Sequence, residues 1–207
     1  MADKVDFKRT VPSYTAKRDV PELVEVPDLR YLAVDGAGDP NTDAYADAVS
    51  ALYPVAYRLK FTSKGDLGRD YVVPPLEGLW WAEDHASFTS GRDKSKWSWT
   101  LLLLLPDWVG DDLLAGALDR VEAGGDPPAR LRDVRVEALS EGLCVQALHV
   151  GAYDDEAELL RRVHEEFIPE HGLAPTGRHH EVYLSDPRRT APAKRRTIVR
   201  QPVARLG

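Results

Sequence analysis

The 207-residue sequence predicts an α+β fold made of two similar halves, each with the order strand, helix, strand, strand. One supporting observation is the repetition of this order along the chain. A second is the local likeness between residues 32–39 and residues 148–154, where a strand runs into a turn. A third is the turn-forming run of Gly, Asp and Pro at residues 124–128, which separates the halves. We therefore expect one domain over residues 1–207, with pseudo-repeats at about residues 20–125 and 130–203.

The elements of the first half follow an N-terminal arm at residues 1–20. Residues 24–36 contain a strand, and the cluster DGAGDPN at residues 35–41 is a turn. Apolar residues recur at helical spacing over residues 44–61, which predicts a helix capped by Asn41 or Thr42. The further expected elements of this half are an extended segment at 71–81, a strand at 97–105 and a helix at 107–122.

The second half repeats the plan. Its expected elements are strands at 134–138 and 143–150, a turn at 151–155, a helix at 156–171, and strands at 180–185 and 197–203. Each half alone would leave one sheet face exposed, so we expect the halves to pack side by side. The cleft between them is the predicted ligand site.

Composition excludes several classes of protein. The chain is 43% hydrophobic and 29% charged, which is typical of a globular protein. Its longest apolar run, residues 101–105, is far shorter than the roughly 20 residues of a membrane-spanning helix. No signal peptide is visible, and the single cysteine, Cys144, cannot form an internal disulfide. We expect a cytoplasmic protein with no membrane partner.

The charge is unevenly distributed. The net charge is −7, yet residues 188–207 contain seven basic residues and no acidic one. The rest of the chain is therefore more acidic than the whole, and an acidic body repels nucleic acid. We expect no direct nucleic-acid partner, and we interpret the basic run as a solvated strand face or as a partner of the acidic body.

Four tryptophans fall within one short region. Trp80 and Trp81 lie on one expected strand, and Trp97 and Trp99 lie on the next. Alternation along a strand would bring three of these rings together. Trp rings stack on flat aromatic ligands and on cations, so the cluster predicts an aromatic pocket; the alternative is a bulky core.

Glu181 is the candidate for acid–base chemistry. It lies in an apolar strand and shares a strand face with Tyr183. A buried carboxylate without a partner costs several kcal/mol, so Glu181 is either exposed or functional. As a functional group it would act as a general base or as the counter-charge of a cation. Glu77 has a similar, weaker setting.

Other chemistries find no support. His179 and Glu181 could share a metal, but two ligands are too few for zinc, and we predict no metal and no cofactor. Cys144 lies in an apolar strand and is expected to pack. Dinucleotide, Walker and GxSxG motifs are missing.

Four segments strongly resemble the stand-alone GyrI-like proteins: residues 35–41, 73–81, 97–99 and 177–189. The resemblance spans roughly residues 4–203 and implies a duplicated strand–helix–strand–strand fold with a central cleft. Relatives are effector domains of multidrug-responsive transcription regulators, which bind flat, often cationic drugs in an aromatic pocket with a glutamate. Glu181 matches that glutamate, and Trp80, Trp99 and Tyr183 match aromatic positions. With them, Trp81, Trp97, Glu77 and His180 complete the candidate ligand-binding set.

The resemblance also implies an activity, because some stand-alone members are cyclopropyl hydrolases that open the ring of spirocyclopropyl-dienone DNA alkylators. In such a reaction Glu181 would orient or deprotonate water, and Tyr71 or Tyr183 would donate a hydrogen bond to the carbonyl oxygen. Two alternatives stay open: a non-catalytic drug-binding sponge or sensor, and a gyrase-inhibitor-like protein-interaction module. The expected partner is a hydrophobic aromatic small molecule, and we also consider a homodimer.

Overall fold

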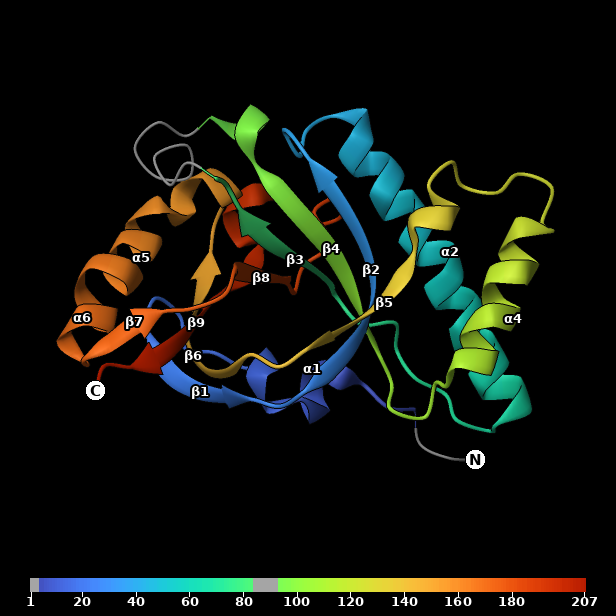
Figure 1. Ribbon diagram of the computed structural model, residues 1–207, viewed down its shortest axis with the longest axis horizontal. Helices are drawn as coiled ribbons and strands as arrows, with labels where there is room; N and C mark the ends of the chain where they lie inside the picture. Colours follow the sequence, from blue (N-terminus) through green and yellow to red (C-terminus); the bar gives the residue numbers. More distant parts are fainter. Residues whose placement is uncertain (1–3, 84–92) are drawn as a thin grey trace. The chain divides into compact units, whose positions relative to one another are not determined.

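The computed structural model describes residues 4–83 and 93–207 and shows an α+β chain (Figure 1). It contains two compact units, which we describe separately. Unit 1 comprises Met1–Phe7, Leu29–Pro74 and Trp80–Leu139. Unit 2 comprises Lys8–Asp28, Pro75–Leu79 and Ser140–Gly207.

The sheet of unit 1 is built around strand β2 (Leu29–Ala37). β2 pairs antiparallel with β4 (Ser98–Leu105) on one side and with β5 (Arg135–Leu139) on the other. The central residues of β2, from Tyr31 to Val34, are fully buried, so both faces of the strand are covered. The strands predicted within 24–36 and at 97–105 and 134–138 are confirmed within a few residues.

Among the residues that the structure describes, two long helices belong to unit 1. Helix α2 (Asp43–Asp66) extends past the predicted end at residue 61, and its buried residues, such as Ala48, Leu52 and Leu59, follow helical spacing. Helix α4 (Asp111–Glu122) runs beside α2 (Figure 1).

The sheet of unit 2 runs in the order β1 (Glu22–Val26), β6 (Gly142–Val150), β9 (Arg196–Arg205), β8 (His179–Tyr183) and β3 (Leu76–Trp81). The short strand β7 (Leu173–Pro175) pairs with the end of β9. The last two residues of β3, Trp80 and Trp81, belong to unit 1.

One face of the unit 2 sheet is covered by a helical segment over residues 157–170. It consists of α5 (Ala157–Arg161), a π-helical stretch (Arg162–Phe167) and α6 (Ile168–Glu170) (Figure 1). Leu159 packs on Ala147 and Val199, while residues further along the segment pack on the far ends of β6 and β9. We therefore call this side of the sheet the helix face of unit 2.

Each unit contains a strand from the other half of the sequence. β1 precedes β2 in the chain, but it pairs with β6 in unit 2. β5 precedes β6, but it pairs with β2 in unit 1. The first twenty residues, predicted to be an arm, include a short helix α1 (Phe7–Thr10). Of the helices in the described residues, none is long and apolar enough to cross a membrane.

Candidate functional site

Glu181 lies on the helix face of unit 2. It is directly opposite Val199 on the neighbouring strand, and Val199 packs under the helical segment with Leu159. Tyr183 lies two residues further along β8, opposite Thr197, and therefore points to the same side. The predicted sharing of one strand face by Glu181 and Tyr183 agrees with this register.

The Glu181 carboxylate is mostly buried but has a partner. Its side chain is 14% exposed, and His179 Nε2 lies 3.3 Å from Glu181 Oε1. His179 precedes Glu181 by two residues, so alternation along β8 brings both side chains to the same face. The imidazole thus offsets part of the cost of removing this carboxylate from water.

Tyr153 joins this group from the end of β6. It starts a 3₁₀ turn (Tyr153–Glu156), and its ring meets Tyr183 edge to face with ring centres 5.7 Å apart. The guanidinium of Arg195 lies 5.2 Å from the centre of the Tyr153 ring, within the range of a cation–π contact. Burial raises the pKa of Tyr153, as do the nearby charges of Glu181 and Glu156, while Arg195 acts in the opposite direction.

The sequence analysis missed Tyr153 because it lies in a segment predicted only as a turn. A signal was present, however. Residues 151–155 connect a buried strand to the helix, and Tyr153 is the aromatic residue of this connection. Here it packs on Tyr183.

His180 points to the opposite side of β8, into a buried network of charges. His180 Nδ1 lies 2.9 Å from Glu141 Oε1, and His180 Nε2 lies 3.0 Å from Glu77 Oε2. The side chains of His180 and Glu77 have no exposed surface. Arg200 completes the network, with Nη1 3.2 Å from Glu141 Oε2.

The network holds His180 in its charged form. Burial alone would lower the pKa of His180, but the charge of Glu141, the hydrogen bond to Glu141 and the close approach of Glu77 outweigh it and raise the pKa to about 9. Burial would raise the pKa of Glu141, yet His180 and Arg200 lower it to about 2. Glu141 therefore pairs with two cations, His180 and Arg200, inside unit 2.

The N-terminal segment of unit 2 closes over this network. Tyr14 donates its hydroxyl to Glu77, and Arg200 donates to the backbone oxygen of Ser13 at 2.7 Å. Gln146, opposite Arg200 in the sheet, donates to the backbone oxygen of Thr15 at 2.9 Å. Glu77 and His180 were predicted to contact ligand; in the structure both are enclosed by protein, and a ligand-contacting role for them stays a prediction.

An aromatic cluster in unit 1 contains three of the predicted tryptophans together with Tyr45. The Trp80 ring lies 5.8 Å from Trp97, and Tyr45 lies 6.1 Å from Trp80 and 5.2 Å from Trp99. Trp80 is nearly buried and Trp97 is half-buried. Of this cluster, the half-buried Trp97 and Tyr45 therefore offer surface to a ligand.

Trp99 has a different environment, since its side chain is fully buried. It donates Nε1–H to the backbone oxygen of Gly38 at 3.2 Å, and its ring lies against Gly36 so closely that a Cβ there would be 2.0 Å from the ring. Residues 35–37, predicted to begin a turn, instead belong to β2, where Gly36 is opposite Trp99 and leaves room for its ring because it has no side chain. Trp81, the fourth predicted tryptophan, is half-buried at the end of β3.

Tyr71 lies in a separate aromatic group of unit 1. Its ring contacts Phe7 and Trp108, each with ring centres 6.1 Å away. The side chain is almost fully buried, and this burial raises the pKa of Tyr71. Within residues 4–83 and 93–207, its ring contacts none of Trp80, Trp97 and Trp99.

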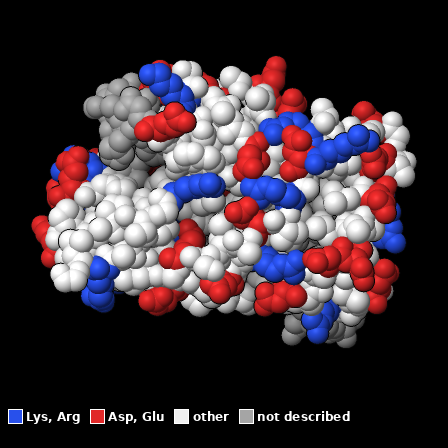
Figure 2. All heavy atoms as spheres, viewed as in Figure 1, with Lys and Arg blue, Asp and Glu red and all other residues white. Residues whose placement is uncertain are grey.

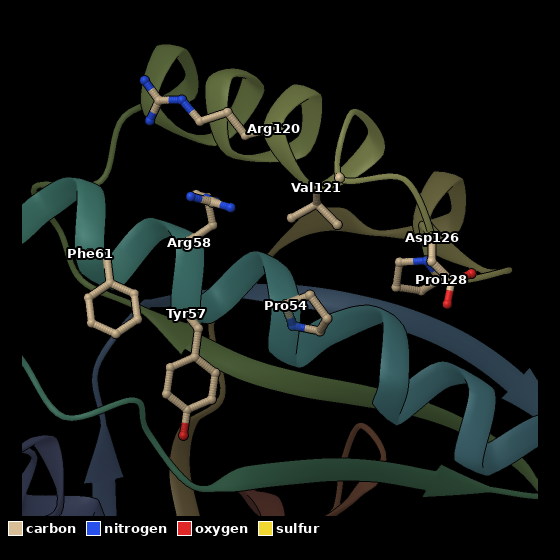
Figure 3. Close-up of a pocket in the computed structure, with 9 residues that line it drawn as sticks. Pro54, Tyr57, Arg58, Phe61, Arg120, Val121, Asp126 and Pro128 are labelled. Atoms are coloured by element: carbon tan, nitrogen blue, oxygen red, sulfur yellow. The ribbon is translucent and has the colours of Figure 1, made fainter.

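A surface groove of about 530 Å³ lies between α2 and α4 (Figure 3). Tyr57, Phe61, Arg58 and Arg120 are among the residues that line it. None of the site residues predicted from the sequence lines this groove. On the face shown in Figure 2, acidic and basic side chains are interspersed.

Within residues 4–83 and 93–207, no group of three or more His, Cys, Asp or Glu side chains is placed to hold a metal ion. Cys144 is buried, and burial together with the charge of Glu141 raises its pKa to about 12. A thiol with so high a pKa is a poor nucleophile.

Comparison with known proteins identifies the family. The model of the GyrI-like small molecule binding domain matches residues 20–204. The chain belongs to the GyrI-like family. This confirms the fold predicted from the sequence, while the ligand cleft between the halves stays a prediction. As a GyrI-like chain, it carries a small-molecule-binding domain.

Two solved structures from Listeria innocua are similar to this GyrI-like chain over nearly its whole length. An uncharacterized conserved protein is 39% identical with a TM-score of 0.87, covering 97% of this chain and 100% of that one. A hydrolase is 36% identical with a TM-score of 0.85, covering 98% and 100%. The C-terminal domain of EcmrR, 11% identical with a TM-score of 0.56 over 90% and 98%, shares the fold. A comparison with curated proteins finds no match.

Proposed function

We propose that this GyrI-like chain is a hydrolase that opens the cyclopropane ring of spirocyclopropyl-dienone DNA alkylators and so protects the cell. The observation that carries the proposal is the group on the helix face of unit 2, where the mostly buried Glu181 lies beside His179 and shares its strand face with Tyr183. Two Listeria innocua structures 36% identical to this chain are of proteins named as hydrolases, which supports hydrolytic chemistry.

The proposed reaction adds one water molecule. The water oxygen bonds to the unsubstituted cyclopropane carbon, and the bond from that carbon to the spiro carbon breaks. The electron pair of the broken bond enters the dienone ring, which becomes aromatic, and negative charge appears on the former carbonyl oxygen. The proton lost by water is balanced by protonation of that oxygen, so the product is a phenol with a new alcohol.

Glu181 is the proposed general base. A carboxylate removes a proton from water as the carbon–oxygen bond forms, and enclosure in protein keeps it from full hydration. His179 Nε2, 3.3 Å from Glu181 Oε1, fixes the direction of the carboxylate. As the ring opens, negative charge develops on the carbonyl oxygen, where a hydrogen-bond donor stabilises it. The sequence predicts Tyr183 or Tyr71 as this donor. Tyr71 is enclosed by Phe7 and Trp108, so we propose a packing role for it.

The experiment is incubation of the protein with a spirocyclopropyl-dienone alkylator, followed by mass analysis of the small molecule. We expect a product heavier by one water, and a rate about 10²-fold lower for Glu181→Gln, the usual scale for a general base. Glu170→Gln, the same change at an exposed position of α6, is the matched control and should keep the rate. Equal turnover by Glu181→Gln would remove Glu181 from this role.

A second candidate function is binding without chemistry, favoured by the aromatic cluster of Tyr45, Trp80 and Trp97. Half-buried Trp and Tyr rings suit flat aromatic ligands and cations. If the alkylator is recovered unchanged while tryptophan fluorescence is quenched on mixing, the chain is a drug-binding sponge or sensor and the hydrolase proposal fails.

A further inference from the structure

The hydroxyl group of Tyr153 is not engaged by the protein. It makes no hydrogen bond to any residue of 4–83 or 93–207, although the ring itself is held on two sides. By contrast, the Tyr14 hydroxyl donates a hydrogen bond to Glu77, in the buried charge network of the same unit. Tyr153 is half-buried, so its hydroxyl can meet a ligand from solvent.

The position of Tyr153 is fixed by the turn that carries it. His149 Nε2 lies 3.0 Å from the backbone oxygen of Ala152, the residue before Tyr153. Gly151 donates its backbone N–H to the oxygen of Arg195 at 3.0 Å, which ties the turn to the start of β9. A Cβ at Gly151 would lie 2.8 Å from His149 Nε2, so this close packing requires glycine.

Arg195 is held equally firmly beside the ring. Its Nη2 donates to the backbone oxygen of Pro187 at 3.2 Å, in the segment that connects β8 to β9. Arg195 has no carboxylate within ion-pair distance among the described residues, so its charge is not cancelled by a direct partner. Tyr153 is thus a phenol whose ring contacts both a fixed positive charge and Tyr183.

We infer that the Tyr153 hydroxyl donates the hydrogen bond to the carbonyl oxygen of a dienone ligand, and that Arg195 stabilises the negative charge that grows on that oxygen. The inference rests on the proposed function and changes one part of it, since the sequence assigned the donor to Tyr183 or Tyr71. Tyr183 then forms the wall against which the Tyr153 ring and the ligand rest.

The chemistry of the two groups suits this role. A donor must keep its proton while the ligand oxygen becomes negative, and burial with the nearby carboxylates Glu181 and Glu156 keeps the pKa of Tyr153 above its ordinary value. A donor that is already in place, beside a fixed cation, stabilises developing charge without reorganising at the moment of reaction.

The test uses a dienone that cannot react, so that binding is read apart from turnover. The probe is 4,4-dimethylcyclohexa-2,5-dienone, which has the carbonyl and the flat ring but no cyclopropane. Infrared spectroscopy of the bound probe reports hydrogen bonding as a shift of the carbonyl band to lower frequency. We expect the shift with the wild-type protein and its loss in Tyr153→Phe, which keeps the ring, with affinity lower by about 3- to 10-fold.

Two further variants separate the candidate donors. Tyr183→Phe should keep the band shift, and Arg195→Gln should reduce it without removing it. Tyr57→Phe, at an exposed tyrosine of unit 1, is the matched control for the substitution and should behave as wild type.

An unchanged shift in Tyr153→Phe, loss of the shift in Tyr183→Phe, or failure of the wild-type protein to bind the probe would each overturn the inference. The cyclopropane assay gives a separate answer. A Tyr153-dependent band shift combined with no hydrated product would retain the donor and reject the proposed hydrolysis.

Discussion

His180 and Glu141 form an ion pair in the interior of unit 2, with Nδ1 2.9 Å from Oε1. The pair is extended by Glu77 on the other ring nitrogen and by Arg200 on the other carboxylate oxygen. Such a network specifies one arrangement of strands, because each charge is satisfied only when β8, β9 and the turn before β6 are all in place. The network also lies on the face of β8 opposite Glu181. One face of this short strand therefore carries the ion-pair network, and the other carries Glu181.

Removing one member of this network should be costly. Glu141→Gln deletes the charge that both His180 and Arg200 rely on, and leaves buried cations that are poorly compensated. Loss of one partner of a buried pair typically costs about 3–5 kcal/mol, so we expect the free energy of unfolding in urea to fall by about 3 kcal/mol or more. Glu158→Gln, which breaks an exposed pair with Arg161, should produce no resolvable change; a similar effect in both variants would contradict the structural role of Glu141.

The network also predicts how stability depends on pH. The pKa of His180 is raised from 6.5 to about 9 in the folded protein, so its contribution is complete below about pH 6.5 and is lost as the pH rises through 9. Over that window the folded state binds more protons than the unfolded state, and the free energy of unfolding should fall by up to about 1.4 kcal/mol per pH unit.

Glu141 acts at the other end of the pH scale. Its pKa is lowered from 4.5 to about 2, so its contribution is present above about pH 4.5 and is lost as the pH falls through 2.

Urea unfolding measured from pH 5 to pH 10 in wild type and His180→Asn checks the alkaline side. If the alkaline slope is equally steep in His180→Asn, some other group is responsible for it.

The sequence was sufficient for the local elements, because alternation and helical spacing reflect which residues are buried. It was insufficient for the exchange of β1 and β5 between the halves. β1 pairs with β6, far along the chain, and neither strand carries a local signal for that partner. The split of residues 24–36 into β1 and β2 follows from Pro27, which cannot donate a backbone hydrogen bond to a sheet.

The site was only partly predictable for a related reason. Glu181 and Tyr183 were found together because two-residue spacing on a strand fixes a shared face. Glu141 and Tyr153 lie in turns, where polar and aromatic residues are usually solvated, so their partners depend on tertiary packing. Arg200 could have been noticed, since an arginine inside the apolar run of residues 197–203 requires a buried carboxylate.

The contact between Gly36 and Trp99 gives a third prediction. Gly36→Ala places a Cβ 2.0 Å from the buried Trp99 ring, which forces the indole or β2 to shift, and overpacking of this kind typically costs about 1–3 kcal/mol. Gly116→Ala is the matched control, because Gly116 lies within α4 with open space around it. It should stabilise the protein by up to about 1 kcal/mol through helix propensity. Thermal unfolding of both variants measures the contrast, and a stable Gly36→Ala protein would show that Trp99 can move.

Of the tryptophans in unit 1, we expect Trp97 to contribute to ligand binding and Trp99 to contribute to the stability of the core. Trp97 is half-buried, so Trp97→Leu should leave stability nearly unchanged but weaken binding of a flat cationic dye, ethidium, by about 3- to 10-fold through loss of ring stacking. Trp99→Phe removes the hydrogen bond to Gly38 and part of a buried ring, and should instead lower the free energy of unfolding by about 1–3 kcal/mol. Fluorescence titration of ethidium, with Tyr57→Leu as an aromatic control in the groove between α2 and α4, measures the difference. Weaker binding by Tyr57→Leu with wild-type binding by Trp97→Leu would place the dye in that groove, which Tyr57 lines.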